Sequence, residues 1–371
     1  MHVKYSYLEE QFADPQPILE EIAKLVRSTD YTLGKSVEEF EARFAEVIGG
    51  QFAVGVNSGT DALFLSLKAL EVGPGDEVIT APNTFIATVG AIVAVGAKPV
   101  FVDVLGDYTI NPAFIEQAIT SNTKALLPVH YAGHPADMPA IMALAEKHHL
   151  PVIEDACQAI SASIDNKNAG TYGMAAGFSL HPLKNLNVWG DGGIIVTDSE
   201  ELCKRLRLLR NHGLKNRDEV QVFGYNSRLD SLQAVVGNYL INDLEQITAQ
   251  RIAWANMLDA GLADLSEYIT IPERKPNRRY VYHLYIVMAK ARDRLLAFLH
   301  EHKIEAKIHY PIPLHLQEVT QRLGYQEGDF PVAEAQAKSM ITLPVHQHLR
   351  QEHIQYMLDT IHTFYREVYG A

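Results

Sequence analysis

The sequence contains little cysteine: Cys157 and Cys203 are the only two among 371 residues. So few cysteines exclude a disulfide framework, and nothing in the sequence indicates an oxidising compartment. Long apolar runs are also missing, because the most apolar window, 88–97, is too short to span a bilayer. The first residues lack the apolar stretch of a signal peptide. We therefore expect a cytoplasmic protein that does not associate with membranes.

Basic residues are outnumbered as well. The chain has 32 Lys and Arg against 45 Asp and Glu, which gives a formal net charge of −13. This balance argues against nucleic acid as a partner, because a general phosphate-backbone binder needs a basic surface. It does not argue against a single phosphate held at the N-terminus of a helix. The apolar share of 47% is that of a globular protein, and the length suits one large and one small domain.

Short apolar runs alternate with amphipathic stretches along the first half of the chain. Strands are expected at 52–56 and 151–155, and helices at 60–70 and 138–149, among others. Such alternation predicts an α/β fold with a mostly parallel sheet covered on both faces, whose ligands bind at the carboxyl ends of the strands. Helical patterns lengthen after about residue 230. We therefore predict a large domain over 1–244, beginning with a helical segment, and a small α+β domain over 245–371.

Lys184 is the candidate for a reactive amine. It follows a short apolar strand and a proline turn, and it precedes the glycine-rich turn 190–193. A lone lysine is usually a solvated surface residue, but this position favours a partly desolvated amine with a lowered pKa. Such an amine can form a Schiff base with pyridoxal 5′-phosphate. Asp155, at the end of an apolar strand, could pair with the pyridine nitrogen, or it could be a plain loop or N-cap carboxylate.

A phosphate site is expected between the first predicted strand and its helix. Gly59 lets the backbone approach an anion closely, and the helix dipole favours negative charge there. The simpler interpretation is a capped helix start, with Ser58 or Thr60 as the N-cap. Ser179 could add a hydroxyl to the same phosphate. Phe85 could stack on the cofactor ring, although a lone phenylalanine more often lies in a core.

The order of these motifs resembles the DegT/DnrJ/EryC1/StrS family of sugar aminotransferases, within PLP fold type I. The resemblance covers nearly the whole chain and is most specific at 154–158 and 178–185. It implies that Lys184 tethers the cofactor and then moves the proton between the cofactor carbon and the sugar carbon. Asp155 would pair with the pyridine nitrogen, and Gln158 would contact the ring oxygen.

The resemblance also implies residues at the edge of the site. Asn226 would reach the phosphate of a neighbouring subunit, so the family pattern implies a homodimer with shared active sites. Substrate contacts are expected at His309, Tyr310 and His315, with a packed loop as the alternative. One departure is Leu180, where many relatives have an aromatic residue, and it could reshape the pocket. No motif predicts a metal site.

The implied activity is transfer of an amino group, with glutamate as the expected donor, to a keto or aldehyde sugar. The acceptor would be a nucleotide-linked 3- or 4-keto-6-deoxy sugar, or a free acidic keto sugar such as 8-oxo-Kdo, in surface-polysaccharide, lipopolysaccharide or deoxyaminosugar biosynthesis. One branch of the family has histidine in place of the lysine and performs dehydration, so Lys184 favours transamination. Two alternatives remain, namely a PLP-dependent sugar dehydratase on the same scaffold and a non-catalytic sugar-binding or scaffold protein.

A basic stretch precedes the strand expected at 285–288. Its four basic side chains could bind a carboxylate or a diphosphate of the substrate, or they could belong to a solvated loop. They are Arg274, Lys275, Arg278 and Arg279.

Overall fold

The computed structural model describes residues 1–370. Its main layer combines a four-stranded sheet of order β1-β9-β8-β5 with a three-stranded sheet of order β3-β2-β4. Two parallel bridges, Leu126 to Val152 and Val129 to Asp155, join the two sheets between β4 and β5. The strands are β1 (Phe52–Val56), β2 (Glu77–Thr80), β3 (Lys98–Phe101), β4 (Thr123–Leu126), β5 (Ile153–Asp155), β8 (Ala175–Ser179) and β9 (Gly193–Thr197).

The main layer is mostly parallel, as the alternation of strands and helices predicts. Strands β2, β3 and β4 pair in parallel, and so do β5 and β8. Strand β9 is reversed and pairs antiparallel with both β1 and β8. A short connection can join antiparallel neighbours, and the link from β8 to β9 is the segment that contains Lys184. The lysine therefore lies just beyond the carboxyl end of β8.

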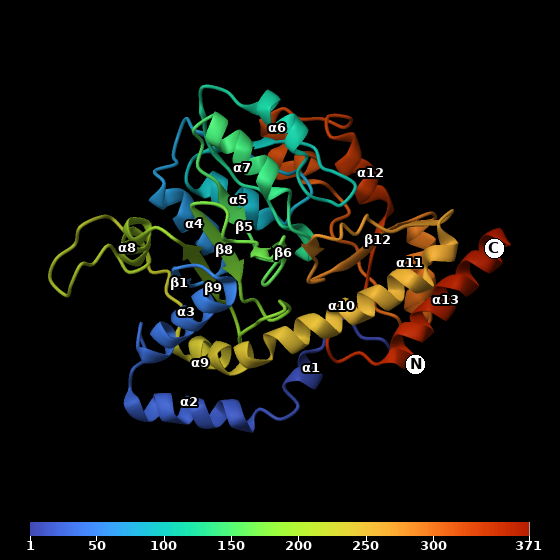
Figure 1. Cartoon of the computed structure of the whole chain (residues 1–371), viewed down its shortest axis with the longest axis horizontal. Helices are drawn as coiled ribbons and strands as arrows, with labels where there is room; N and C mark the ends of the chain where they lie inside the picture. Colours follow the sequence, from blue (N-terminus) through green and yellow to red (C-terminus); the bar gives the residue numbers. More distant parts are fainter. Residues whose placement is uncertain (371) are drawn as a thin grey trace.

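Helices cover both faces of this layer (Figure 1). Ala53 and Ile194 pack with α3 and α9 on one face, whereas Val54 and Ile195 pack with α4 and α8 on the other. Side chains alternate between the two faces because a strand has a period of two residues. The helices are α1 (Leu8–Gln11), α2 (Gln16–Ser28), α3 (Lys35–Ile48), α4 (Gly59–Ala69), α5 (Ile86–Ala94), α6 (Pro112–Ala118), α7 (Met138–Lys147), α8 (Glu200–Leu209) and α9 (Ser231–Leu240).

A second core lies beside the first. The long helix α10 leads from the side of α9 towards this second core (Figure 1). The core is formed by a three-stranded sheet of order β10-β12-β13 and by helices α10, α11 and α13. Its elements are β10 (Ile269–Thr270), β12 (Tyr285–Ala289), β13 (Met340–Leu343), α10 (Leu244–Gly261), α11 (Arg292–Glu301) and α13 (Gln351–Tyr369). Helix α12 (Pro331–Ser339) instead packs through Ala333 with residues of β2 and β3. A small separate sheet is formed by β6 (Ser163–Ile164), β7 (Lys167–Asn168) and β11 (Arg278–Arg279).

The start of the chain packs with the second core. Val3 is fully buried in it and forms a parallel bridge with Ile304. Helix α10 begins at Leu244, where the sequence patterns change. A domain boundary between residues 244 and 245 stays a prediction, and the first residues contact the part of the chain that lies beyond it.

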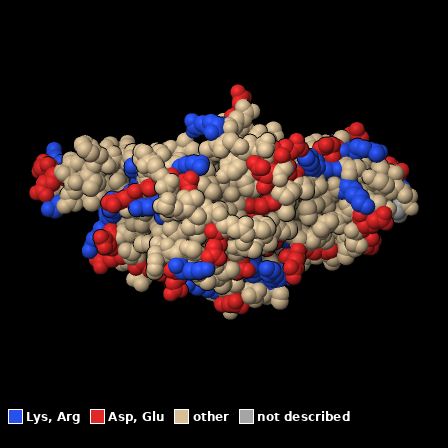
Figure 2. Space-filling view, turned by 90° about the horizontal axis from the view of Figure 1, so that it is seen from above, with Lys and Arg blue, Asp and Glu red and all other residues tan. Residues whose placement is uncertain are grey.

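Acidic and basic side chains are mixed on the molecular surface. On the face in Figure 2, the coloured side chains of the described residues alternate in sign and do not gather into one broad basic patch. Within residues 1–370, none of the helices combines the length and the apolar character that crossing a membrane requires.

Candidate functional site

Most of the predicted site residues line one cavity at the carboxyl ends of β5 and β8. Its volume is about 400 Å³, and it is bounded by α4, the start of α5 and residues 283–284 and 309–310 from the later part of the chain. The lining includes Ser58, Gly59, Thr60, Phe85, Asp155, Gln158, Ser179, Lys184, His309 and Tyr310. The structure therefore brings together residues that lie up to about 250 positions apart in the sequence.

Lys184 is held by its backbone and leaves its amine facing the cavity. Its carbonyl accepts hydrogen bonds from the Tyr7 hydroxyl at 2.8 Å and from Asn187 Nδ2 at 3.2 Å. Burial lowers the pKa of the Lys184 amine, and the negative charge that Cys157 and Asp155 would contribute opposes that shift. A lowered pKa increases the fraction of free amine near neutral pH, which is the form that attacks an aldehyde.

Asp155 is a buried carboxylate, 5% exposed, at the end of β5. Its Oδ2 accepts a hydrogen bond from the Thr88 hydroxyl at 2.6 Å, and its Oδ1 accepts one from the Cys157 N–H at 3.2 Å. Within residues 1–370 it forms no ion pair with a basic side chain. A buried negative charge without a basic partner is costly. A protonated pyridine nitrogen in the cavity would supply the missing positive charge, so the residue fits pyridoxal phosphate.

The start of α4 forms the floor of the expected phosphate site. Ser58 is the N-cap, and its hydroxyl accepts a hydrogen bond from the Asp61 N–H at 3.1 Å. A Cβ atom on Gly59 would lie 2.7 Å from the Cβ of Ser179 and 2.9 Å from the Sγ of Cys157. Glycine is thus required here, and the first N–H groups of the helix remain available to an anion. The capped helix start and the anion site are compatible at this position.

Gln158, Phe85, His309 and Tyr310 complete the cavity wall. Gln158 is fixed because its Oε1 accepts a hydrogen bond from the Ala132 N–H at 2.7 Å. The rings of Phe85 and Tyr310 lie 5.8 Å apart, and Phe85 is half exposed at the N-terminus of α5. His309 lies 3.0 Å from the Thr342 hydroxyl through its Nδ1, and burial lowers its pKa to about 4.

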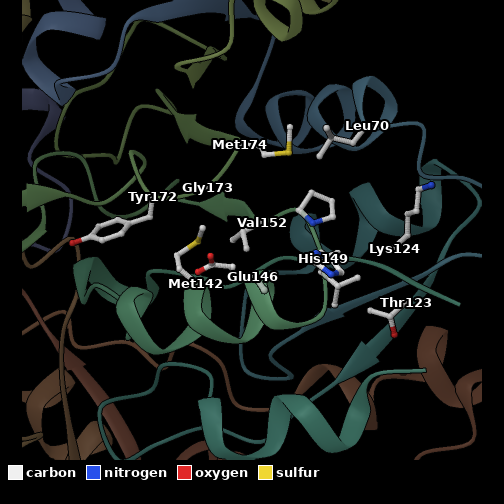
Figure 3. A pocket seen from close by; sticks show the side chains of 13 residues that line it. Leu70, Thr123, Lys124, Met142, Glu146, His149, Val152, Tyr172, Gly173 and Met174 are labelled. Carbon is white, nitrogen blue, oxygen red and sulfur yellow. The ribbon is translucent and has the colours of Figure 1, made fainter. Parts of the chain in front are cut away.

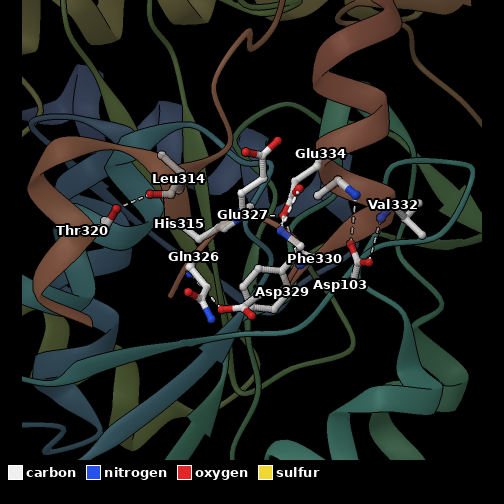
Figure 4. Close-up of polar contacts among 12 residues, drawn as sticks. Asp103, Leu314, His315, Thr320, Gln326, Glu327, Asp329, Phe330, Val332 and Glu334 are labelled. Atoms are coloured by element: carbon white, nitrogen blue, oxygen red, sulfur yellow. Dashed lines mark hydrogen bonds and ion pairs between the residues drawn. The ribbon is translucent and has the colours of Figure 1, made fainter. Parts of the chain in front are cut away.

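His315 does not line this cavity. Its Nε2 is 3.0 Å from Glu334 Oε1, and its side chain is buried beside Phe330 (Figure 4). Glu334 also accepts a hydrogen bond from the Gly328 N–H at 2.8 Å, so the pair fixes the turn before α12. His315 therefore lies in a buried pair with Glu334, outside the cavity where the substrate contacts are expected. His315 lies within a 3-10 turn at Leu314–Leu316, which begins after Pro313.

Asn226 also lies outside the cavity of its own chain. It forms an antiparallel bridge with Asn211. The bridge closes the base of a projecting segment, residues 212–225, which we call the arm and which leaves the molecule next to α8 (Figure 1). Apolar side chains on the arm face solvent, with Phe223 100% exposed and Val220 63% exposed. The predicted contact of Asn226 with a neighbouring subunit stays a prediction.

The basic stretch is occupied by internal partners. Arg274 pairs with Asp259 at 2.9 Å, Arg278 lies near Asp107 and Arg279 pairs with Glu245. The side chain of Arg278 is only 4% exposed, so this part of the stretch is neither a solvated loop nor a free anion site. None of the four basic residues lines the cavity, and the three arginines pair with carboxylates elsewhere in the chain.

Several residues of the cavity wall were not predicted from the sequence motifs. Tyr5 comes from the start of the chain, His283 from the segment before β12 and Thr88 from the first turn of α5. His181 and Asp191 flank Lys184 in the sequence and could have been found by their proximity to it. Thr88 lies three positions after Phe85, whereas Tyr5 and His283 require the tertiary structure because no predicted site residue is near them in the sequence.

A second, wider hollow of about 810 Å³ lies near the start of β5, around Met142, Val152 and Met174 (Figure 3). In Figure 3 the amine of Lys124 points away from the two methionines. The lining described for this hollow pairs no buried carboxylate with a desolvated amine. The smaller cavity around Lys184 is therefore the candidate active site.

A comparison with protein families matches residues 14–362 to the DegT/DnrJ/EryC1/StrS aminotransferase family. The chain belongs to this family. It is 42% identical to a pleiotropic regulatory protein from Geobacillus stearothermophilus, over 99% of both chains. It is also 42% identical to the dTDP-3-amino-3,4,6-trideoxy-α-D-glucose transaminase of Streptomyces venezuelae, over 92% of this chain and 90% of the relative.

The solved structures of the family agree with the fold. The structure of S. venezuelae DesV in complex with a ketimine intermediate has a TM-score of 0.95 and 40% identity, and the match covers 98% of each chain. Related structures hold the cofactor in its pyridoxal or pyridoxamine phosphate form. The predicted fold type I is confirmed, and so are the predicted enzyme class, a sugar aminotransferase, and its cofactor, pyridoxal phosphate.

Proposed function

We propose that the chain transfers the amino group of an amino acid, with glutamate as the expected donor, to a nucleotide-linked keto sugar. The observation that carries this proposal is the presence of Lys184 and Asp155 in one cavity. Lys184 is a partly buried amine with a lowered pKa, and Asp155 is a buried carboxylate without a basic partner. The sugar-transaminase relatives support a nucleotide-linked acceptor.

Each wall residue then has a task. Bound pyridoxal phosphate supplies an electron sink for the carbon that loses or gains a proton. Lys184 holds that proton at Nζ and moves it between the two reacting carbons. Asp155, fixed by the Thr88 hydroxyl, keeps the ring nitrogen protonated. The start of α4 and Ser179 hold the phosphate, and Phe85 shields the ring face.

The charge of the wall favours a keto-sugar ring without a carboxylate over one that carries a carboxylate. A carboxylate on the sugar would need a cationic partner. The cavity lining described within residues 1–370 contains no arginine. His309 is uncharged at neutral pH, because burial and the charges of Lys184 and Lys307 lower its pKa to about 4. A sugar ring that carries a carboxylate, as in 8-oxo-Kdo, therefore fits this wall less well than an uncharged keto-sugar ring, and a diphosphate attached to that ring would have to lie beyond the lining.

The same proposal includes a homodimer in the cytoplasm. Phe223, on the arm that precedes Asn226, is completely exposed. Such an exposed apolar side chain is stabilised when it packs against another protein surface. A second copy of this chain is the occupant implied by the expected role of Asn226. The free thiols Cys157 and Cys203 support a reducing compartment.

Absorbance spectroscopy with product analysis tests the proposal. Glutamate alone should remove the visible absorbance of the lysine-bound cofactor, and a dTDP-linked 3-keto sugar should restore it and gain nitrogen. Lys184→Ala should abolish both changes, whereas Lys204→Ala, at an exposed lysine paired with Glu200, should not. A dehydratase would release a product without nitrogen, and a scaffold protein would leave the spectrum unchanged. Either result would contradict the proposal.

A further inference from the structure

A histidine just before β12 lies next to the candidate cofactor lysine. The Nε2 atom of His283 is 3.4 Å from the Nζ atom of Lys184, and both side chains line the cavity. Among residues 1–370, no other side chain is within hydrogen-bond distance of this amine. The proposed amino transfer assigns no role to His283.

The backbone on both sides of His283 is fixed to the rest of the site. The Val281 N–H donates to the Gly133 carbonyl at 3.1 Å, and the Leu284 N–H donates to the Ala132 carbonyl at 3.2 Å. Asn185, which follows Lys184 directly, donates from its Nδ2 to the Val281 carbonyl at 2.9 Å. The imidazole and the amine are therefore positioned by a shared network rather than by two independent loops.

The residue before His283 has an unusual backbone conformation. Tyr282 has a φ of 46°, in the left-handed region that bulky residues rarely adopt. Its carbonyl accepts a hydrogen bond at 3.1 Å from Arg251, a guanidinium that is 1% exposed. Such conformations persist where the surroundings determine them, and they cluster at functional sites.

The surroundings of His283 decide which ring nitrogen holds the proton. Its Nδ1 atom is buried and has no hydrogen-bond partner. Buried N–H groups without an acceptor are rarer in proteins than buried acceptors without a donor. The favoured tautomer therefore leaves Nδ1 bare and places the proton on Nε2. From there the N–H points to Lys184, whose amine accepts a hydrogen bond only when it is unprotonated.

The charges around His283 keep the ring neutral. The groups that face it are Lys184 from the β8–β9 link, Arg251 from α10, His309 from the segment before β13 and His181 beside Lys184. Burial lowers the pKa of His283 well below its usual value, and the positive charge of Arg251 adds to the effect, as do those of Lys184, His309 and His181 in their protonated forms. A neutral ring with its proton on Nε2 is a donor at that atom throughout the physiological pH range.

We propose that His283 is a positioning residue for Lys184, whose Nε2–H donates a hydrogen bond to the unprotonated Nζ and holds the amine ready for the cofactor or substrate carbon. A hydrogen bond to the neutral form of a group disfavours its charged form. His283 would thus act together with desolvation to keep Lys184 as a free base. The inference rests on the proposed function only in that Lys184 is the amine that reacts.

Competitive acetylation of the cofactor-free, full-length chain tests the inference without using turnover. The rate at which trace acetic anhydride modifies Lys184, followed against pH by mass spectrometry, reports the pKa of its amine. In His283→Leu we expect that pKa to rise by roughly half to one unit, which slows acetylation about threefold to tenfold near pH 7. In His283→Gln, whose amide can place an N–H near the Nε2 position, we expect a value close to that of the wild type. The exposed Lys204 should react alike in all three proteins.

Two results would overturn the inference. One is an unchanged or faster acetylation of Lys184 in His283→Leu, and the other is a Gln variant that behaves like Leu. If the Leu variant fails to fold, ¹⁵N–¹H spectra of the histidine-labelled wild type decide, with His283 assigned by its loss in the Gln variant. We expect protonation at Nε2, and protonation at Nδ1 would refute the mechanism. Because the chain carries no cofactor in these experiments, their outcome is separate from that of the glutamate and sugar experiment.

Discussion

Replacing Glu154 by glutamine should destabilise the core around the main sheet more than the replacement of any surface residue. Glu154 is 0% exposed on β5, directly before Asp155. Its two oxygens accept four hydrogen bonds, at 2.9 Å from His130, 2.8 Å from the Gly170 N–H and 2.7 Å from each of the Tyr172 and Gly173 N–H groups. The carboxylate therefore fixes the 170–173 turn and the His130 loop.

The expected magnitude follows from the donors that glutamine cannot satisfy. One amide oxygen can serve two of the four donors, and the amide NH₂ then faces the other two. His130 cannot become an acceptor at Nε2 without losing its contact with Ala136, because its Nδ1 already accepts from the Ala136 N–H at 3.0 Å. Breaking a buried charged network in this way costs about 3–5 kcal/mol. A chain of this size should lose roughly 5 °C in Tm.

Urea unfolding of the cofactor-free chain, followed by circular dichroism, measures the loss. The matched control is Glu116→Gln, at an exposed pair with Lys147 and His148, where we expect a change below about 0.5 kcal/mol. A loss below about 1 kcal/mol at Glu154 would refute the reasoning. So would a control variant that loses as much stability as the buried one.

The pH dependence gives the sign of the same effect. Burial raises the pKa of Glu154, but the hydrogen bonds from His130, Gly173 and Gly170 outweigh burial and leave that pKa below 4.5. A carboxyl whose pKa is lower in the folded state stabilises the fold above its unfolded pKa. The stability difference between wild type and Glu154→Gln should therefore be constant above about pH 5 and shrink as the pH falls below 4.5. A difference that shrinks only at higher pH would contradict this assignment.

Three further changes test other parts of the structure. Gly59→Ala should weaken cofactor binding at least about tenfold in equilibrium dialysis, since its Cβ has no space, whereas Gly90→Ala, which meets open space, should not. Arg210→Met leaves the buried Glu41 without its close partner, so urea unfolding should show a loss of about 3–5 kcal/mol, and a near-neutral result would contradict the pairing. His315→Ala should lower Tm but leave the KM for the keto sugar unchanged, and a raised KM would return His315 to the substrate site.

Local patterns were sufficient to predict the strands and the central pair of site residues. The strand expected at 52–56 appears with those bounds, and the one expected at 151–155 is the shorter β5, which begins at Ile153. Lys184 and Asp155 could be brought together from sequence, since both follow buried strands whose carboxyl ends meet at one edge. The order of the motifs along the chain also indicated the family, and the family match over residues 14–362 confirms that prediction.

Partners distant in sequence account for what the patterns missed. His315 is close to Tyr310 in sequence, yet its contact with Glu334 holds it outside the cavity. His283 and Tyr5 reach the cavity from the second core and from the start of the chain, and neither belongs to a motif near the lysine. Period and spacing describe one element at a time, whereas these contacts depend on how elements pack against one another.

The central claim is that Lys184 is the residue that binds pyridoxal phosphate. Borohydride reduction of the holoenzyme fixes the cofactor on its lysine, and peptide mapping by mass spectrometry then locates it. We predict a single modified peptide that contains Lys184, and no modification after the enzyme has been converted with glutamate. Label on any other lysine, or none before glutamate is added, would contradict the account.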